Sequence, residues 1–262
     1  MNSFKDARRI VVKVGTSSIT YDTGMVNIRQ IEKLCRILAD IKNSGREVVL
    51  VTSGAIAVGA SKLGLKHKPR TIPEKQAAAA VGQCELMYIY DKHFIEYHHK
   101  VAQILLTRDI IDSDERRGHA VNTMETILEQ GVIPIVNEND SVSVEEIRIG
   151  DNDTLSALVA SLVHADALIL LSDIDGLFEA DPREKPDAAI IPRVTAIDEH
   201  IETIAGGAGS SRGTGGMATK IAAAKICFDA GCTMAIINSN RLDGIYDLLE
   251  GRQVGTIFQK ED

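Results

Sequence analysis

The chain has 262 residues, of which 44% are hydrophobic and 25% charged, and its formal net charge is −8 with histidine counted as neutral. This composition is ordinary for a soluble globular protein and excludes collagen-like repeats and intrinsic disorder. Lysine and arginine never occur in runs longer than two, so the chain lacks the basic face that nucleic acids require. We therefore expect no nucleic-acid partner.

The four cysteines, Cys35, Cys84, Cys227 and Cys232, are scattered along the chain. None forms the C-x-x-C spacing of a zinc site or a redox pair, so we expect reduced thiols. The sequence contains no signal peptide and no uninterrupted apolar run of about 18 residues, the length that a membrane-spanning helix needs. We expect a cytoplasmic protein that does not bind membranes.

Predicted strands and helices alternate along the whole chain. Residues 9–14 form an apolar, β-branched run that predicts a strand, and the apolar positions of 26–43 have helical spacing. Further strands are predicted at 48–52, 101–106, 132–136, 167–171, 233–237 and 255–258, and further helices at 73–97, 114–130, 152–164, 217–230 and 245–249. Residues 141–149 alternate with a period of two, which predicts a hairpin.

The predicted strands are mostly apolar throughout, without alternation, which is typical of strands covered on both faces by helices. No linker, repeat or change of composition divides the chain. We therefore predict one α/β domain, a three-layer sandwich with a mostly parallel central sheet.

Small, polar or charged residues follow four of these predicted strands, at 13–17, 52–55, 137–140 and 172–176. Ligands of parallel α/β sheets bind outside the carboxyl ends of the strands, where such residues converge. These four segments are therefore the candidate binding site.

Residues 206–220 (GGAGSSRGTGGMATK) form a glycine-rich segment before a predicted helix. Such a segment lets backbone N–H groups approach a phosphate, and Lys220 would lie in the first helical turn. The alternative is a glycine-rich loop without function. Gly213, Gly215 and Ala218 match the dinucleotide fingerprint G-x-G-x-x-G/A, but no strand precedes them, and the common P-loop motif is absent from the sequence.

Lys13 lies inside the first apolar strand, where a charged side chain is costly unless it is paired or binds an anion. The alternative is an amine that reaches solvent from the strand end. Residues 150–154 (GDNDT) open a helix, where a single Asp or Asn would serve as an N-cap. An Asp between Lys13 and Lys220 would hold both lysines for phosphoryl transfer.

Eight segments together resemble the amino acid kinase family: VVKVGTSS, VTSGAIAVG, AAVGQ, LLTRDI, PIVNENDSV, GDNDTLSALVA, LSDIDGLFEADPR and GTGGMATKIAAA. The resemblance runs from about residue 8 to residue 258 and implies a three-layer αβα fold of about eight strands, similar to carbamate kinase. It further implies a single domain over 1–262, with a substrate-binding N-terminal part and an ATP-binding part from about 165 to 262. Many relatives carry an additional C-terminal PUA-type domain, which we do not expect in this chain.

The substrate-side motifs, NENDSV followed by IGDNDTLSAL, favour the glutamate-phosphorylating branch of this family. The resemblance then implies ATP-dependent phosphorylation of the γ-carboxylate of L-glutamate, the first step of proline biosynthesis, with Mg²⁺ as cofactor. It also implies feedback inhibition by L-proline and a homodimer or homotetramer. No general base is needed, because a glutamate carboxyl with a pKa of about 4.3 is ionised at neutral pH.

Residue roles carried over from the family fall into three groups. Lys13 and Lys220 contact the transferred phosphate, and Asp153 organises these lysines. Glutamate is held by Ser53, Asp140 and Asn152, with Asn137 close by. The ATP-binding residues are Lys13, Ser172, Asp173, Thr214, Gly215, Gly216, Met217, Ala218, Thr219 and Lys220. Ser172 stands where the family usually has Thr, and no direct ligand of the metal is predicted.

Three other functions remain open from the sequence. N-acetylglutamate, aspartate, carbamate and UMP kinases share the ATP-binding half, so only the substrate-side motifs distinguish them. A catalytically silent regulator that senses an amino acid or a nucleotide would not need both lysines and Asp153. An NAD-dependent dehydrogenase would rest on the incomplete dinucleotide fingerprint alone.

Overall fold

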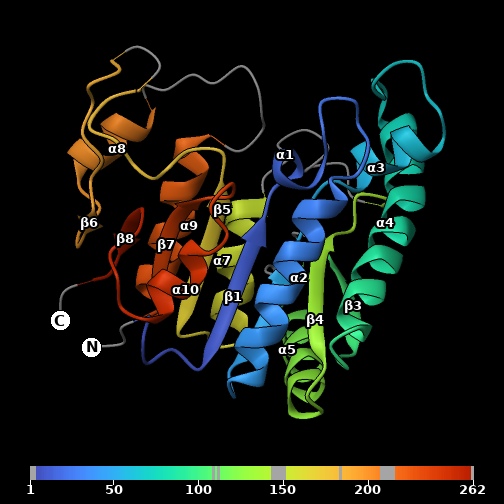
Figure 1. Cartoon of the computed structure of the whole chain (residues 1–262), viewed down its shortest axis with the longest axis horizontal. Helices are drawn as coiled ribbons and strands as arrows, with labels where there is room; N and C mark the ends of the chain where they lie inside the picture. The colour runs from blue at the N-terminus through green and yellow to red at the C-terminus, as the bar shows by residue number, and fades with distance from the viewer. Residues whose placement is uncertain are drawn as a thin grey trace. The chain divides into compact units, whose positions relative to one another are not determined.

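Strands and helices alternate in the computed structural model, which describes residues 4–107, 110, 113–142, 152–182, 185–206 and 216–260 (Figure 1). The strands are β1 (Arg9–Val14), β2 (Glu47–Val51), β3 (Val101–Leu106), β4 (Ile133–Glu138), β5 (Ala167–Ser172), β6 (Arg193–Val194), β7 (Thr233–Asn238) and β8 (Thr256–Phe258). The helices are α1 (Thr16–Ile19), α2 (Ile28–Asn43), α3 (Ala55–Lys62), α4 (Ile72–Ile95), α5 (Asp114–Glu129), α7 (Asn152–Leu162), α8 (Glu199–Gly206), α9 (Met217–Asp229) and α10 (Gly244–Leu249).

The strands form an eight-stranded sheet in the order β3-β4-β2-β1-β5-β7-β8-β6. The pairs β3–β4, β2–β4, β5–β7 and β6–β8 are parallel, and β7–β8 is antiparallel. The predicted α/β class with a mostly parallel sheet is therefore confirmed. Among the described helices, none combines the length and the apolar character needed to cross a membrane.

Two compact units divide the chain. The first unit is Val14–Gly150, and the second unit consists of Met1–Lys13 with Asp151–Asp262. In the first unit, α3 packs on α4, α4 also contacts α2, and α5 packs on β4. In the second unit, α7 packs on both β5 and α9, and α9 in turn packs on β7.

Helices α3 and α4 cross at two glycines of the first unit. A Cβ atom on Gly59 would lie 1.7 Å from the carbonyl oxygen of Ala78, and one on Gly82 would lie 1.8 Å from that of Ala55. Only glycine allows this close approach of two helix backbones. Because Ala55 is the first residue of α3, the crossing also determines where the preceding Ser53–Gly54 turn lies.

Three strands, β4, β5 and β7, extend further than predicted and have polar ends, and β7 ends at Asn238. β4 continues through Asn137 and Glu138, and β5 continues to Ser172. These three side chains of β4 and β5 are buried, so the polar residues do not end the strands as the hydrophobic pattern suggested. Four short elements, α1, α3, β6 and α8, were not predicted at all. The predicted hairpin at 141–149 lies, from residue 143 onward, outside the described residues.

Candidate active site

Lys13 lies at the carboxyl end of β1, one residue before the strand ends. The apolar residues before it, Ile10, Val11 and Val12, are completely buried, and the lysine itself is only 8% exposed. The alternative in which its amine reaches solvent is therefore wrong. A lysine in this position requires a partner of opposite charge.

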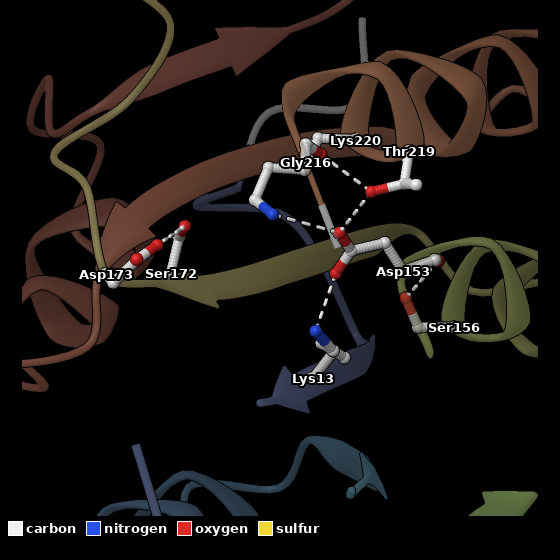
Figure 2. Close-up of polar contacts among 8 residues, drawn as sticks. All are labelled: Lys13, Asp153, Ser156, Ser172, Asp173, Gly216, Thr219 and Lys220. Carbon is white, nitrogen blue, oxygen red and sulfur yellow. Dashed lines mark hydrogen bonds and ion pairs between the residues drawn. The ribbon is translucent and has the colours of Figure 1, made fainter. Parts of the chain in front are cut away.

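Asp153 provides that partner and joins two lysines within the second unit. Its Oδ1 atom lies 2.6 Å from Nζ of Lys13, and its Oδ2 atom lies 3.0 Å from Nζ of Lys220. The hydroxyl of Thr219 donates a hydrogen bond to the same Oδ2 at 3.0 Å (Figure 2). The structure thus brings together the three residues predicted to be catalytic.

The electrostatics of this cluster favour an anionic ligand. Asp153 is 1% exposed and Lys220 is 6% exposed. Burial alone would raise the pKa of Asp153, but the ammonium groups of Lys13 and Lys220 outweigh it and hold that pKa well below its usual range. Two ammonium groups and one carboxylate leave one positive charge in excess, and a phosphoryl group would compensate it.

Asp153 is held in place by the first turn of α7, of which it is the second residue. The hydroxyl of Ser156 donates to the backbone carbonyl of Asp153 at 2.6 Å. An acidic side chain in the first turn also interacts favourably with the helix dipole. The sequence GDNDT therefore places an acid, rather than only a cap, at a defined point in the protein interior.

Thr219 and Lys220 both lie in the first turn of α9, after Gly216. Thr219 is close enough to donate to the carbonyl oxygen of Gly216 as well, at 2.7 Å. The first amide groups of an α-helix have no acceptor within the helix, and the N-terminus carries a partial positive charge. This end of α9 can therefore bind phosphate oxygens through the amides of Met217 and Ala218.

Ser172 is the last residue of β5, and Asp173 follows it directly. The hydroxyl of Ser172 donates to Oδ1 of Asp173 at 3.2 Å, and Figure 2 draws no bond between this pair and the lysine cluster. Thr214 and Gly215, two predicted ATP-binding residues, lie outside the described residues. In the part of the chain that the structure describes, no group of three His, Cys, Asp or Glu side chains is arranged to hold a metal.

The predicted glutamate-binding residues occur in both units. Asn152, the first residue of α7, is 8% exposed and belongs to the second unit. Ser53, Asn137 and Asp140 belong to the first unit. Ser53 precedes Gly54, whose φ of 92° is a left-handed conformation that suits glycine.

Asp140 lines a pocket of about 420 Å³ within the first unit. Its neighbours include Gln83, Glu138, Asn139 and Ser141, and no Lys, Arg or His is among the described residues that line the pocket. Burial raises the pKa of Asp140 to about 6. A pocket with acidic residues and no basic ones is suited to a cationic group such as an ammonium.

Two contacts in these regions were not predicted from the sequence: the bond between Thr219 and Asp153, and the bond between Gln83 and Asn137. The bond between Thr219 and Asp153 joins residues far apart in the chain, and the family resemblance implied only an ATP-binding role for Thr219. No function was predicted for Gln83, the last residue of AAVGQ, although it lies on the buried face of α4 together with Ala79, Leu86 and Tyr90. The available signal was a polar residue on a mostly apolar helix face, which also contains His93.

Comparison with known proteins identifies the class of protein. The amino acid kinase family matches residues 8–238, and the chain belongs to this family. Its fold is shared with carbamate kinase from Giardia lamblia bound to AMP-PNP, with a TM-score of 0.67 and 15% identity over 100% of both chains.

The curated relatives narrow the resemblance to one branch of the family. The chain is 54% identical to a glutamate 5-kinase of Clostridium perfringens, over 98% of this chain and 97% of that protein. It is 52% identical to a glutamate 5-kinase of Listeria innocua, over 98% of this chain and 94% of that protein.

Proposed function

We propose that this chain transfers the γ-phosphoryl group of ATP to the γ-carboxylate of L-glutamate, yielding L-glutamyl 5-phosphate and ADP. This reaction is the first step of proline biosynthesis. Relatives of 54% and 52% identity that are named glutamate 5-kinases support the assignment. The observation that carries the chemistry is Asp153, buried between the ammonium groups of Lys13 and Lys220.

The transfer requires two anions, a carboxylate and a triphosphate, to approach each other. The attacking carboxylate oxygen is already ionised, so it forms the new O–P bond without a general base while the bond to ADP breaks. Lys13 and Lys220 neutralise the charge on the transferred phosphoryl group, and Asp153 fixes their ammonium positions before the substrates bind. Catalysis then rests on positioning and electrostatic stabilisation.

ATP would be held by the N-terminal turn of α9 and by the end of β5. The backbone amides of Gly216, Met217 and Ala218 and the side chains of Thr219 and Lys220 would meet the phosphates, together with Thr214 and Gly215. Ser172 and Asp173 would contact the remainder of the nucleotide. Mg²⁺ commonly reaches such sites bound to substrate phosphates, and it would supply additional charge neutralisation there.

Glutamate would be held by Ser53, Asp140 and Asn152. Asp140 is the acceptor suited to the ammonium group of a free amino acid, because its pocket contains no competing basic residue among the described ones. We further propose a single kinase domain in which the N-terminal part binds glutamate and the part from about 165 onward binds ATP. L-Proline as feedback inhibitor, a homo-oligomeric state and a cytoplasmic location complete the proposal.

ADP release tests the assignment of the acceptor. L-Glutamate, N-acetyl-L-glutamate, L-aspartate, carbamate and UMP are compared at equal concentration with ATP and Mg²⁺. We expect release with L-glutamate and suppression by L-proline. Faster release with any other acceptor contradicts the glutamate assignment, and no release with any of them indicates a silent regulator.

A further inference from the structure

Three side-chain amides form a continuous chain in the first unit. Nδ2 of Asn137 donates to Oε1 of Gln83 at 2.9 Å, and Nε2 of Gln83 donates to Oε1 of Gln103 at 3.3 Å. Asn137 is 1% exposed and Gln83 is 8% exposed, whereas Gln103 is exposed on β3. The chain of amides therefore leads from β4 through α4 to β3, where Gln103 lines a pocket together with Gln83.

The direction of each bond follows from the backbone. The N–H group of Glu138 donates to Oδ1 of Asn137 at 2.9 Å, so this atom must be an oxygen. The other end of the Asn137 amide is then the donor, and Gln83 must present its oxygen to it. Gln83 is thereby fixed with its NH₂ group directed away from Asn137.

The side chain of Asn137 provides a hydrogen-bond acceptor on the side of β4 where β2 has already ended. Val51, the last residue of β2, is in register with Val136, so Asn137 and Glu138 extend beyond the neighbouring strand. The side chain of Asn137 accepts the N–H of Glu138, and the carbonyl of Leu106 accepts the N–H of Asn139 at 2.8 Å. These two bonds fix the backbone just before Asp140.

Gln83 also lines the same pocket as Asp140. We propose that Gln83 is a positioning residue for the free amino acid: it holds Asn137, and through Asn137 it sets the place of Asp140 in the pocket. The inference rests on the proposed function, since it concerns how the same pocket recognises L-glutamate. The proposal gives Asn137 a structural role, which is to hold the backbone of the site just before Asp140.

Gln83→Met tests this role, because methionine has a similar length and cannot accept the bond from Asn137. We expect KM for L-glutamate to rise about tenfold or more, since a small misplacement of a binding group costs a large factor. We expect kcat and KM for ATP to remain within about twofold, because the lysine cluster is untouched. Gln130→Met is the matched control, because Gln130 is an exposed glutamine of the same unit that does not line the pocket, and we expect little change in any constant.

A double-mutant cycle tests whether Gln83 acts through Asn137. In an Asn137→Ala background, Gln83→Met should cause no further rise in KM for L-glutamate. Gln83→Ala takes the place of Gln83→Met if that variant does not fold, as judged by its thermal transition.

The outcomes separate the two proposals. An active wild type whose KM for L-glutamate is unchanged by Gln83→Met overturns the positioning role alone. An equal fall of kcat, an equal effect of Gln130→Met, or additive effects in the double variant overturn it as well. A wild type that does not phosphorylate L-glutamate overturns the proposed function and, with it, this inference.

Discussion

Asp153 allows two ammonium groups to share one buried site. Without its carboxylate, Lys13 and Lys220 would repel each other in a region of low dielectric, and both would bear the full cost of burial. The arrangement keeps both charges ready for a phosphoryl group without reorganisation during the reaction. Such preorganised charge is commonly the largest contribution to catalysis.

Replacing either lysine should remove catalysis while the fold is kept. We expect Lys13→Met and Lys220→Met to lower kcat by about 10²–10³-fold or more, the usual cost of losing one preorganised charge or donor. Lys225→Met is the matched control, because Lys225 lies on the same helix, α9, and forms an exposed ion pair with Glu202. ADP release gives kcat, and near-normal turnover by either of the first two variants would refute their role.

Asp153→Asn should lower stability in a pH-dependent manner. The pKa of Asp153 is depressed in the folded state, so its contribution is fully present above the ordinary Asp pKa of about 4 and is lost as the pH falls through the folded-state value. At neutral pH we expect a loss of about 3–5 kcal/mol in the free energy of unfolding. Urea titrations should show the difference from wild type narrowing below about pH 4. A difference independent of pH would be evidence against this ion pair.

Asp140 should give substrate binding a dependence on pH. Burial raises its pKa to about 6, so the carboxyl becomes neutral as the pH falls below that value and no longer attracts an ammonium group. We expect kcat/KM for L-glutamate to decline below about pH 6, while KM for ATP changes little. Initial rates across pH 5–8 measure this, and Asp140→Asn should abolish the decline at a uniformly low kcat/KM. A wild-type profile without a decline near pH 6 would refute the role of Asp140.

At the scale of residues, the sequence predicted the charges of the site better than its contacts. A lysine within an apolar strand requires a counter-charge, which singled out Lys13, and the glycine-rich segment singled out Lys220. The choice of Asp153 among the polar residues of GDNDT rested on the family resemblance. The hydroxyl of Thr219 on Asp153 could not be predicted in the same way. It depends on where the first turns of α7 and α9 lie relative to each other within the second unit.

At the scale of elements, the crossing of α3 and α4 supports the turn that carries Ser53. Two glycines, Gly59 and Gly82, allow the helix backbones to approach each other, and α3 begins directly after that turn. A side chain at either glycine would separate the helices. The effect would then reach Ser53, one of the residues proposed to bind glutamate.

Gly82→Ala should therefore destabilise the protein. The added Cβ would meet the carbonyl oxygen of Ala55, which is backbone and cannot move independently. Overpacking of this kind costs about 1–3 kcal/mol, occasionally more. Thermal unfolding measures the change, and Gly118→Ala is the control, since its Cβ on α5 would meet nothing within 4 Å. We expect the control to be neutral or slightly stabilising, and equal effects of the two substitutions would contradict the close-contact explanation.

Elements with a long periodic pattern were predicted most closely from the sequence, whereas four short elements, α1, α3, β6 and α8, were missed. Strand β1 and helix α2 have strong periodic patterns and were confirmed at nearly the predicted bounds. Strand β6 has two residues, too few for any pattern. The end of β4 was missed because Asn137 and Glu138 pair with Leu105 and Leu106 of β3 despite their polar side chains, a pairing that hydrophobicity cannot indicate.

At the scale of the whole molecule, the alternation of strands and helices predicted the α/β class, but not the order of the strands. The order β3-β4-β2-β1-β5-β7-β8-β6 follows from pairings between distant segments, which local patterns do not contain. The antiparallel pairing of β8 with β7 is an example, since a three-residue strand has no directional signature. The division into two compact units was also not evident from composition.

The most direct test of the proposed function is to trap its product. An acyl phosphate reacts with hydroxylamine to give a hydroxamate, which a phosphorylated hydroxyl or amine does not. With ATP, Mg²⁺ and L-glutamate, we predict a hydroxamate from the wild type and almost none from Lys220→Met. N-acetyl-L-glutamate and L-aspartate should give none. Two results would contradict transfer to the γ-carboxylate of L-glutamate. One is a hydroxamate from one of these acceptors in place of L-glutamate, and the other is release of ADP from ATP in the presence of L-glutamate without formation of a hydroxamate.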